Sequence, residues 1–158
     1  MCELFGVNHI NCGLMEDYSV EYTAQKLREL CRRAGKYTIG VEPMPYSGLP
    51  DVKKAWAVVK ASGCDNAKLI LDSWHYIRAN QPYDLSVLEG IPAEKIVSIQ
   101  INDGFVKLIR DKGIQPAVIG VEVISDEILS HGVAQAAKEN YEATKDVLAQ
   151  TWPEALEA

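Results

Sequence analysis

The chain has 158 residues, enough for one domain with a hydrophobic core, and its 47% apolar and 24% charged residues are typical of a soluble globular protein. The formal charge is −6 and no run of Lys and Arg occurs, which argues against a nucleic-acid partner. The longest apolar stretches are far shorter than a membrane span, and the first residues lack the basic region of an export signal.

The cysteines point to a reducing compartment. No Cys-x-x-Cys pair occurs, and no export signal accompanies the thiols, so we expect free, mostly buried cysteines in a cytoplasmic protein. The four are Cys2, Cys12, Cys31 and Cys64.

In chain order, the first half alternates two apolar runs with two amphipathic segments. The run at 3–12 predicts a strand, and the helical spacing of apolar residues at 19–35 predicts a helix that stops at Gly35. A second strand is expected at 37–45, where prolines end it. The segment 49–63 then predicts a helix with Pro50 in its first turn and Gly63 at its end.

The same alternation continues to the end of the chain. The further expected strands are 67–72, 95–103 and 117–125, and the further expected helices are 84–91, 105–113 and 126–150. Five nearly continuous apolar strands separated by helices predict an α/β fold with a parallel sheet covered by helices. A doubly wound sheet would carry a Gly-rich loop after its first strand, and "NHINCG" is not one. A (β/α)8 barrel needs eight units, and this chain supplies about five.

Polar residues gather where the expected strands end, and in a parallel sheet these ends share one side. In strand order they are His9 and Asn11, then Glu42, then Asp72 with His75, then Gln100 with Asn102 and Asp103, and last Glu122. Carboxylates in apolar strands are costly to bury, and their mutual repulsion requires a cation or a shared proton. Such an oxygen-rich set predicts a site for Mn2+, Mg2+ or Co2+, with Zn2+ also compatible.

Each of these residues has an ordinary structural alternative. Glu42 could accept a backbone hydrogen bond, Asp72 could cap the following turn, and His75 could be a core histidine. Gln100 could be a buried, hydrogen-bonded amide, and Glu122 an outward-facing ion pair. Arg78 either clamps a phosphate or carboxylate of a substrate or is a solvated side chain.

Four segments in order resemble motifs of the sugar phosphate isomerase/epimerase family, the xylose isomerase-like TIM barrels. They are "GVEPMPYSG", "LILDSWHYIR", "IVSIQIND" and "IGVEVISDE", and the resemblance runs from the first strand to the last helix. It implies one xylose isomerase-like domain over residues 1–158, a partial (β/α)8 TIM barrel equivalent to the family's strands 4–8 and truncated at its amino terminus. The loop after the strand at 95–103 is shorter than in relatives, which removes part of the pocket wall.

The resemblance also implies a site and a reaction. The metal ligands would be Glu42, Asp72, Gln100 and Glu122, and His75 would touch substrate oxygens. Glu42 and Glu122 would be the catalytic acid/base pair, which moves a proton on a sugar through an enediolate.

Several functions remain open. One is a metal-dependent sugar isomerase or epimerase, and a second is an inosose dehydratase-type lyase. A third is an inactive truncated barrel that acts as a binding or assembly partner. The related DNA-repair endonucleases need additional histidine ligands, and this chain has three histidines in all. Because a partial barrel leaves two bare sheet edges, we expect either a homo-oligomer or an aggregation-prone fragment, ahead of a flattened open sheet.

Overall fold

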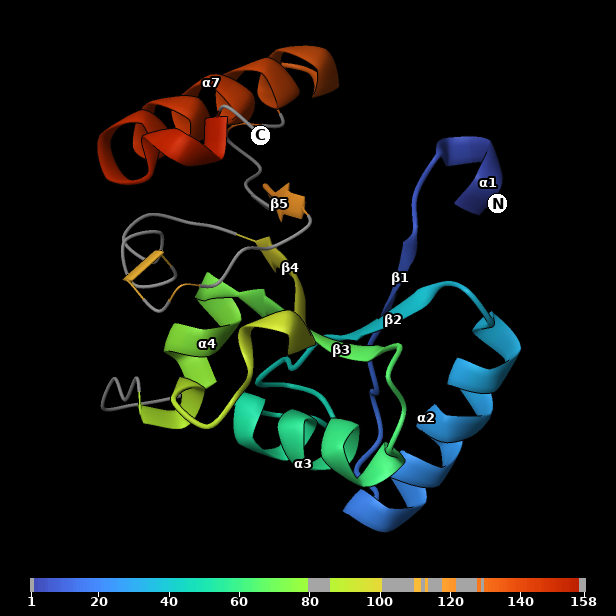
Figure 1. Ribbon diagram of the computed structural model, residues 1–158. Helices are drawn as coiled ribbons and strands as arrows, with labels where there is room; N and C mark the ends of the chain where they lie inside the picture. The colour runs from blue at the N-terminus through green and yellow to red at the C-terminus, as the bar shows by residue number, and fades with distance from the viewer. Residues whose placement is uncertain are drawn as a thin grey trace.

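The sheet consists of five parallel strands. A computed structural model describes residues 2–79, 86–100, 110–111, 113, 118–121, 128 and 130–156. Each strand pairs in parallel with the next along the chain, in the order β1-β2-β3-β4-β5. The strands are β1 (His9–Cys12), β2 (Thr38–Val41), β3 (Ala67–Asp72), β4 (Ile96–Gln100) and β5 (Val118–Gly120). With helices between its strands the sheet forms a half-barrel (Figure 1), which confirms the expected partial (β/α)8 barrel. Its equivalence to strands 4–8 of the family stays a prediction.

Two capped helices cover the first three strands. They are α2 (Val20–Ala34) and α3 (Val52–Ser62). The Ser19 hydroxyl accepts the Tyr22 N–H at 3.2 Å at the start of α2, and the Asp51 carboxylate accepts the Lys54 N–H at 2.7 Å at the start of α3. Gly35 and Gly63 end the helices at φ values of 61° and 65°, where a side chain would be strained. The sequence predicted both stops correctly.

The remaining described elements are shorter or lie at the edge of the fold. They are α1 (Cys2–Phe5), α4 (Ser73–Ala79), η1 (Ser86–Leu88), η2 (Ala93–Lys95), α7 (Val133–Thr151) and η3 (Pro153–Leu156). In Figure 1, α7 lies beyond β5, away from α2 and α3. Its Leu148 joins the hydrophobic core, but Val133 and Tyr141 are exposed.

Alternation along the strands separates two buried faces. Leu69 and Leu71 of β3 belong to the core cluster that packs against the helices. Ile70 lies between them on the opposite, concave face, and it is also completely buried. A Cβ atom on Gly40 of β2 would lie 2.8 Å from the Ile70 side chain, so the glycine leaves room for Ile70 inside the half-barrel. The same alternation directs position 42 and Asp72 onto this concave face.

Several expected boundaries were wrong. The segment 3–12 does not form one strand, because α1 occupies its beginning and β1 starts at His9. His9 therefore lies at the amino end of β1, not at the carboxyl end as predicted. Residues 73–79, where only a turn after Asp72 was expected, form α4, and α7 begins at Val133. Residues 126 and 127, where the last helix was expected to start, lie outside the described residues. Most of the expected helix at 105–113 falls outside the described residues.

The cysteines are all unpaired, as expected, but only Cys31 is buried; the others are partly exposed. The cytoplasmic location inferred from them stays a prediction. Within the described ranges, no helix combines the length and the apolar composition needed to cross a bilayer.

Candidate metal centre

Glu42 directly follows β2, and its backbone fixes it to the neighbouring strand. Its N–H donates to the Cys12 carbonyl of β1 at 3.0 Å, which extends the parallel pairing by one residue. Its side chain is only 14% exposed. The carboxylate thus sits at the carboxyl ends of the strands, where it is largely withdrawn from solvent.

Asp72 ends β3 and is 4% exposed. One oxygen, Oδ1, accepts the backbone N–H of His75 at 2.7 Å. This bond satisfies a donor in the first turn of α4, so the turn-capping alternative is observed for that oxygen. The second carboxylate oxygen makes no hydrogen bond to the described residues and is left for another partner.

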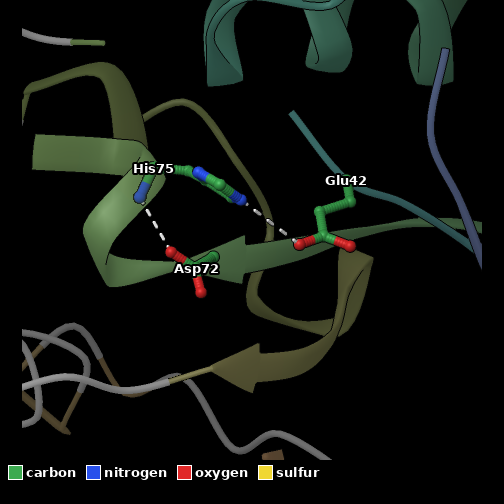
Figure 2. A group of neighbouring side chains, drawn as sticks. All are labelled: Glu42, Asp72 and His75. Atoms are coloured by element: carbon green, nitrogen blue, oxygen red, sulfur yellow. Dashed lines mark hydrogen bonds and ion pairs between the residues drawn. The ribbon is translucent and has the colours of Figure 1, made fainter. Parts of the chain in front are cut away.

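The first turn of α4 brings His75 into the same group. Figure 2 shows its imidazole extending toward Glu42, with Nε2 3.9 Å from the Glu42 Oε1 atom. Potential ligand atoms of Glu42, Asp72 and His75 all lie within 4.8 Å of one another. Three donors from two neighbouring strands and a helix start therefore converge on one place.

Aromatic side chains hold the His75 ring in position. The ring of Tyr46, from the loop between β2 and α3, meets it edge-on at a centroid distance of 5.6 Å. The Trp74 ring meets it in the same manner at 5.2 Å. The His75 Nδ1 atom is buried and has no hydrogen-bond partner among the described residues.

Gln100 lies beside the group on the next strand. It is paired with Asp72 across β3 and β4 and with Gly120 across β4 and β5. Its Oε1 atom is buried, and within the described part of the chain it accepts no hydrogen bond. A hydrogen bond that would make Gln100 a satisfied buried amide is therefore not observed for this oxygen among the described residues. A buried acceptor without a partner requires an explanation, such as an ion or a water molecule.

The donor set fits a divalent cation. Ligand atoms that share an ion with bonds of about 2.1 Å lie roughly 3–4 Å apart, so small side-chain movements would bring the three donors into range. Carboxylate and amide oxygens with one imidazole nitrogen suit Mn2+, Mg2+, Co2+ or Zn2+. The residues that could hold the ion are Glu42, Asp72 and Gln100, with His75 as a donor that the sequence placed on the substrate instead.

The other predicted site residues lie elsewhere or outside the description. Glu122, predicted as both ligand and catalytic residue, falls outside the described residues, as do Asn102 and Asp103. Arg78 lies one turn after His75 on α4, exposed, with its guanidinium 4.8 Å from the centre of the Trp74 ring. Sequence reasoning missed Tyr46, which lies in a loop without periodicity.

A family model described as a xylose isomerase-like TIM barrel matches residues 1–133. No curated protein matches the sequence.

Solved structures share the fold at low sequence identity. The IolI protein, solved with a zinc atom, is 18% identical with a TM-score of 0.80, and the match covers 96% of this chain and 66% of that one. A xylose isomerase domain-containing protein of Salmonella typhimurium is 12% identical with a TM-score of 0.72, over 98% and 65%. The 3-keto-D-glucoside 4-epimerase of E. coli is 14% identical with a TM-score of 0.52, over 81% and 57%. The chain thus spans about two thirds or less of the length of each.

Proposed function

The chain belongs to the family of xylose isomerase-like TIM barrels, and on that premise we propose that it binds a divalent metal ion and moves a proton on a sugar or polyol-derived substrate. The proposed ligands are Glu42, Asp72, Gln100 and Glu122, with His75 close enough to serve either the ion or the substrate. The convergence of Glu42, Asp72 and His75 within 4.8 Å is the observation that carries this proposal. The zinc atom of the similar IolI structure supports the choice of a divalent ion.

The reaction proposed is an isomerisation or epimerisation. When bound, the ion would polarise the oxygens of the substrate and make the neighbouring C–H group more acidic. Glu42 would accept that proton, and the position of its carboxylate, mostly withdrawn from water and facing His75, supports this role. Glu122, in its protonated form, would deliver a proton to the enediolate, at the neighbouring carbon or on the opposite face. Proton exchange with solvent would then return both carboxyl groups to their starting states. His75 would donate a hydrogen bond to a substrate oxygen and so keep the reacting carbon of the substrate next to the Glu42 carboxylate.

Calorimetric titration with Mn2+ tests the site. We expect one ion per chain, and we expect Glu42→Gln and Asp72→Asn to weaken binding by at least about tenfold each. The matched control is Glu139→Gln, which removes a partly exposed carboxylate of α7 and should leave the affinity unchanged. Equal affinity in all four proteins would contradict the assignment.

Proton transfer is measured by NMR of ketoses and aldoses incubated with the Mn2+-loaded protein in D2O. Incorporation of deuterium next to the carbonyl, lost in Glu42→Gln, supports the proposed reaction. Loss of water from a polyol-derived ketone such as an inosose would indicate the lyase alternative. Both reactions begin by removal of the same type of proton.

A second candidate function is a binding or assembly partner without turnover. The observation that favours it is the open sheet, in which β1 and β5 each pair with only one described strand. The chain also spans 66% of the length of the IolI structure. We propose that homo-oligomerisation covers these edges. Sedimentation with and without Mn2+ gives the mass, and metal binding without deuterium exchange would favour this second function.

A further inference from the structure

Two large aromatic side chains lie exposed beside the candidate metal centre. Tyr46 is 62% exposed and Trp74 is 44% exposed, although both rings contact the imidazole of His75. Core aromatics bury their rings, whereas these two keep their outer faces open next to a polar group. An indole or phenol face of this kind is suited to the C–H face of a sugar ring.

An arginine side chain contacts one of these two rings, that of Trp74. The Arg78 guanidinium lies over the Trp74 ring at 4.8 Å, which is within the range of a cation–π contact. Arg78 makes no hydrogen bond or ion pair with the described residues, although the chain carries a net charge of −6. Its fork of N–H donors is therefore orientated by the indole and open toward solvent.

We propose, as a refinement that rests on the proposed function, that Tyr46, Trp74 and Arg78 form a recognition rim for a sugar that carries an anionic group. The sugar ring stacks on the exposed aromatic faces, and Arg78 receives a carboxylate or phosphate through two parallel hydrogen bonds. The carboxylates of Glu42 and Asp72 alone would repel such a substrate. The positive charges of the metal ion and of Arg78 offset that repulsion from two sides.

A purely structural role of Trp74 and Arg78 predicts a different experimental result from a role in ligand recognition. Trp74 and Arg78 are four residues apart on α4, and such pairs stabilise a helix surface without any ligand. A structural pair would affect all ligands alike when it is removed. Removal of the Arg78 charge from a recognition rim weakens binding of the anionic ligands and spares the neutral one.

The experiment uses the Mn2+-loaded full chain and three ligands with one carbon skeleton: glucose, glucose 6-phosphate and glucuronate. Dissociation constants are measured by calorimetry for the wild type, Arg78→Gln, Arg78→Lys and Trp74→Phe. We expect at least one anionic sugar to bind tenfold or more tightly than glucose, and the two anionic ligands distinguish phosphate from carboxylate. Arg78→Gln should remove this preference, with less than a twofold change for glucose, and Arg78→Lys should restore only part of it.

The matched control is Arg33→Gln, which removes an exposed arginine of α2 and should change no constant. The Mn2+ affinity of each variant is measured alongside and should not change for the rim variants. Bound Mn2+ without a preference for anionic sugars, or without any sugar binding, overturns the rim and leaves the proposed metal site intact. A preference that persists in Arg78→Gln also overturns it. Absence of Mn2+ binding in the wild type instead contradicts the proposed function.

Discussion

At the amino ends of β2, β3 and β4 polar side chains have partners, whereas at the carboxyl ends buried polar atoms are left without them. The Asn66 amide before β3 donates to the carbonyls of Cys31, Gly35 and Tyr37 at 3.0 to 3.3 Å, which closes the end of α2. Arg28 closes the end of α3, with donors 3.0 Å from the Ser62 carbonyl and 3.1 Å from the Ala61 carbonyl. Lys95 does the same for the turn before β3, at 3.3 Å from the carbonyls of Cys64 and Asp65.

The carboxyl ends present the opposite arrangement. Gln100 Oε1 and His75 Nδ1 are buried without a partner among the described residues, close to two carboxylates. A buried polar atom without a partner lowers stability by about 1–3 kcal/mol. The amino ends of β2, β3 and β4 are thus closed by side-chain hydrogen bonds, whereas the carboxyl ends hold groups that a ligand would satisfy. At the amino end of β1, the buried Nδ1 atom of His9 also has no partner among the described residues.

The largest expected effect on folding lies at the amino ends. Asn66→Asp keeps the side-chain volume but replaces a donor with an anion facing three carbonyl oxygens. We expect the free energy of unfolding to fall by about 2–4 kcal/mol, since hydrogen bonds are lost and a charge meets acceptors. Urea denaturation measures this change, and Mn2+ affinity should stay the same. Asp65→Asn, its exposed neighbour, is the control and should lie within about 0.5 kcal/mol of the wild type.

A smaller effect of opposite sign is expected at Asp72. Asp72→Asn keeps an oxygen that can accept the His75 N–H and removes one of the clustered charges, so the metal-free protein should be unchanged or more stable by up to about 1 kcal/mol. Asp72→Ala also removes the cap and should be less stable than Asp72→Asn by about 1 kcal/mol. Thermal denaturation with and without Mn2+ checks both. If the metal-free Asp72→Asn protein lost as much stability as Asn66→Asp, the proposed difference between the amino and carboxyl ends of the strands would be contradicted.

Substitution of Gln100 should lower the affinity for Mn2+ without lowering the free energy of unfolding. Because its buried oxygen has no partner in the described structure, Gln100→Met should leave the free energy of unfolding unchanged or raise it by up to about 1 kcal/mol. The same substitution removes a proposed ligand, and we expect Mn2+ affinity to fall by about tenfold. Destabilisation without loss of affinity would mean that the amide has a structural partner after all.

A pH-dependent effect is expected at the buried thiol of Cys31 on α2. Burial, with a further contribution from the neighbouring Cys64, raises the pKa of Cys31 from 9.0 to about 12. The unfolded chain ionises near pH 9 while the folded one keeps the proton, so this contribution to stability is complete below pH 9 and is lost as the pH rises toward 12. The slope is at most about 1.4 kcal/mol per pH unit. Urea denaturation of wild type and Cys31→Ala between pH 8 and 11 measures the difference, and parallel curves would contradict it.

Local sequence signals predicted much of the fold. The run at 67–72 forms β3 with the expected bounds. A short apolar segment between a turn and an aspartate is typical of a buried strand. Gly35 and Gly63 ended their helices because the positive φ required there favours glycine. Helix α4 was missed because it starts directly after β3, with the last strand residue as its cap and no break between them.

The same reasoning from the sequence predicted only part of the candidate site. Glu42 and Asp72 could be predicted because parallel strands bring their carboxyl ends to one side. The approach of His75 to Glu42 depends on the turn of α4, and that of Tyr46 on a loop, so spacing alone could not supply either. His9 was misplaced because the beginning of its apolar run folds as α1.

X-ray absorption at the zinc K-edge of the zinc-loaded protein tests the metal centre most directly. We expect a first shell of oxygen and nitrogen atoms at about 2.0–2.2 Å, with an imidazole contribution if His75 is a ligand, and a changed shell in Glu42→Gln. A shell containing sulfur at about 2.3 Å would assign the ion to the cysteines and contradict the proposal that Glu42 and Asp72 hold it.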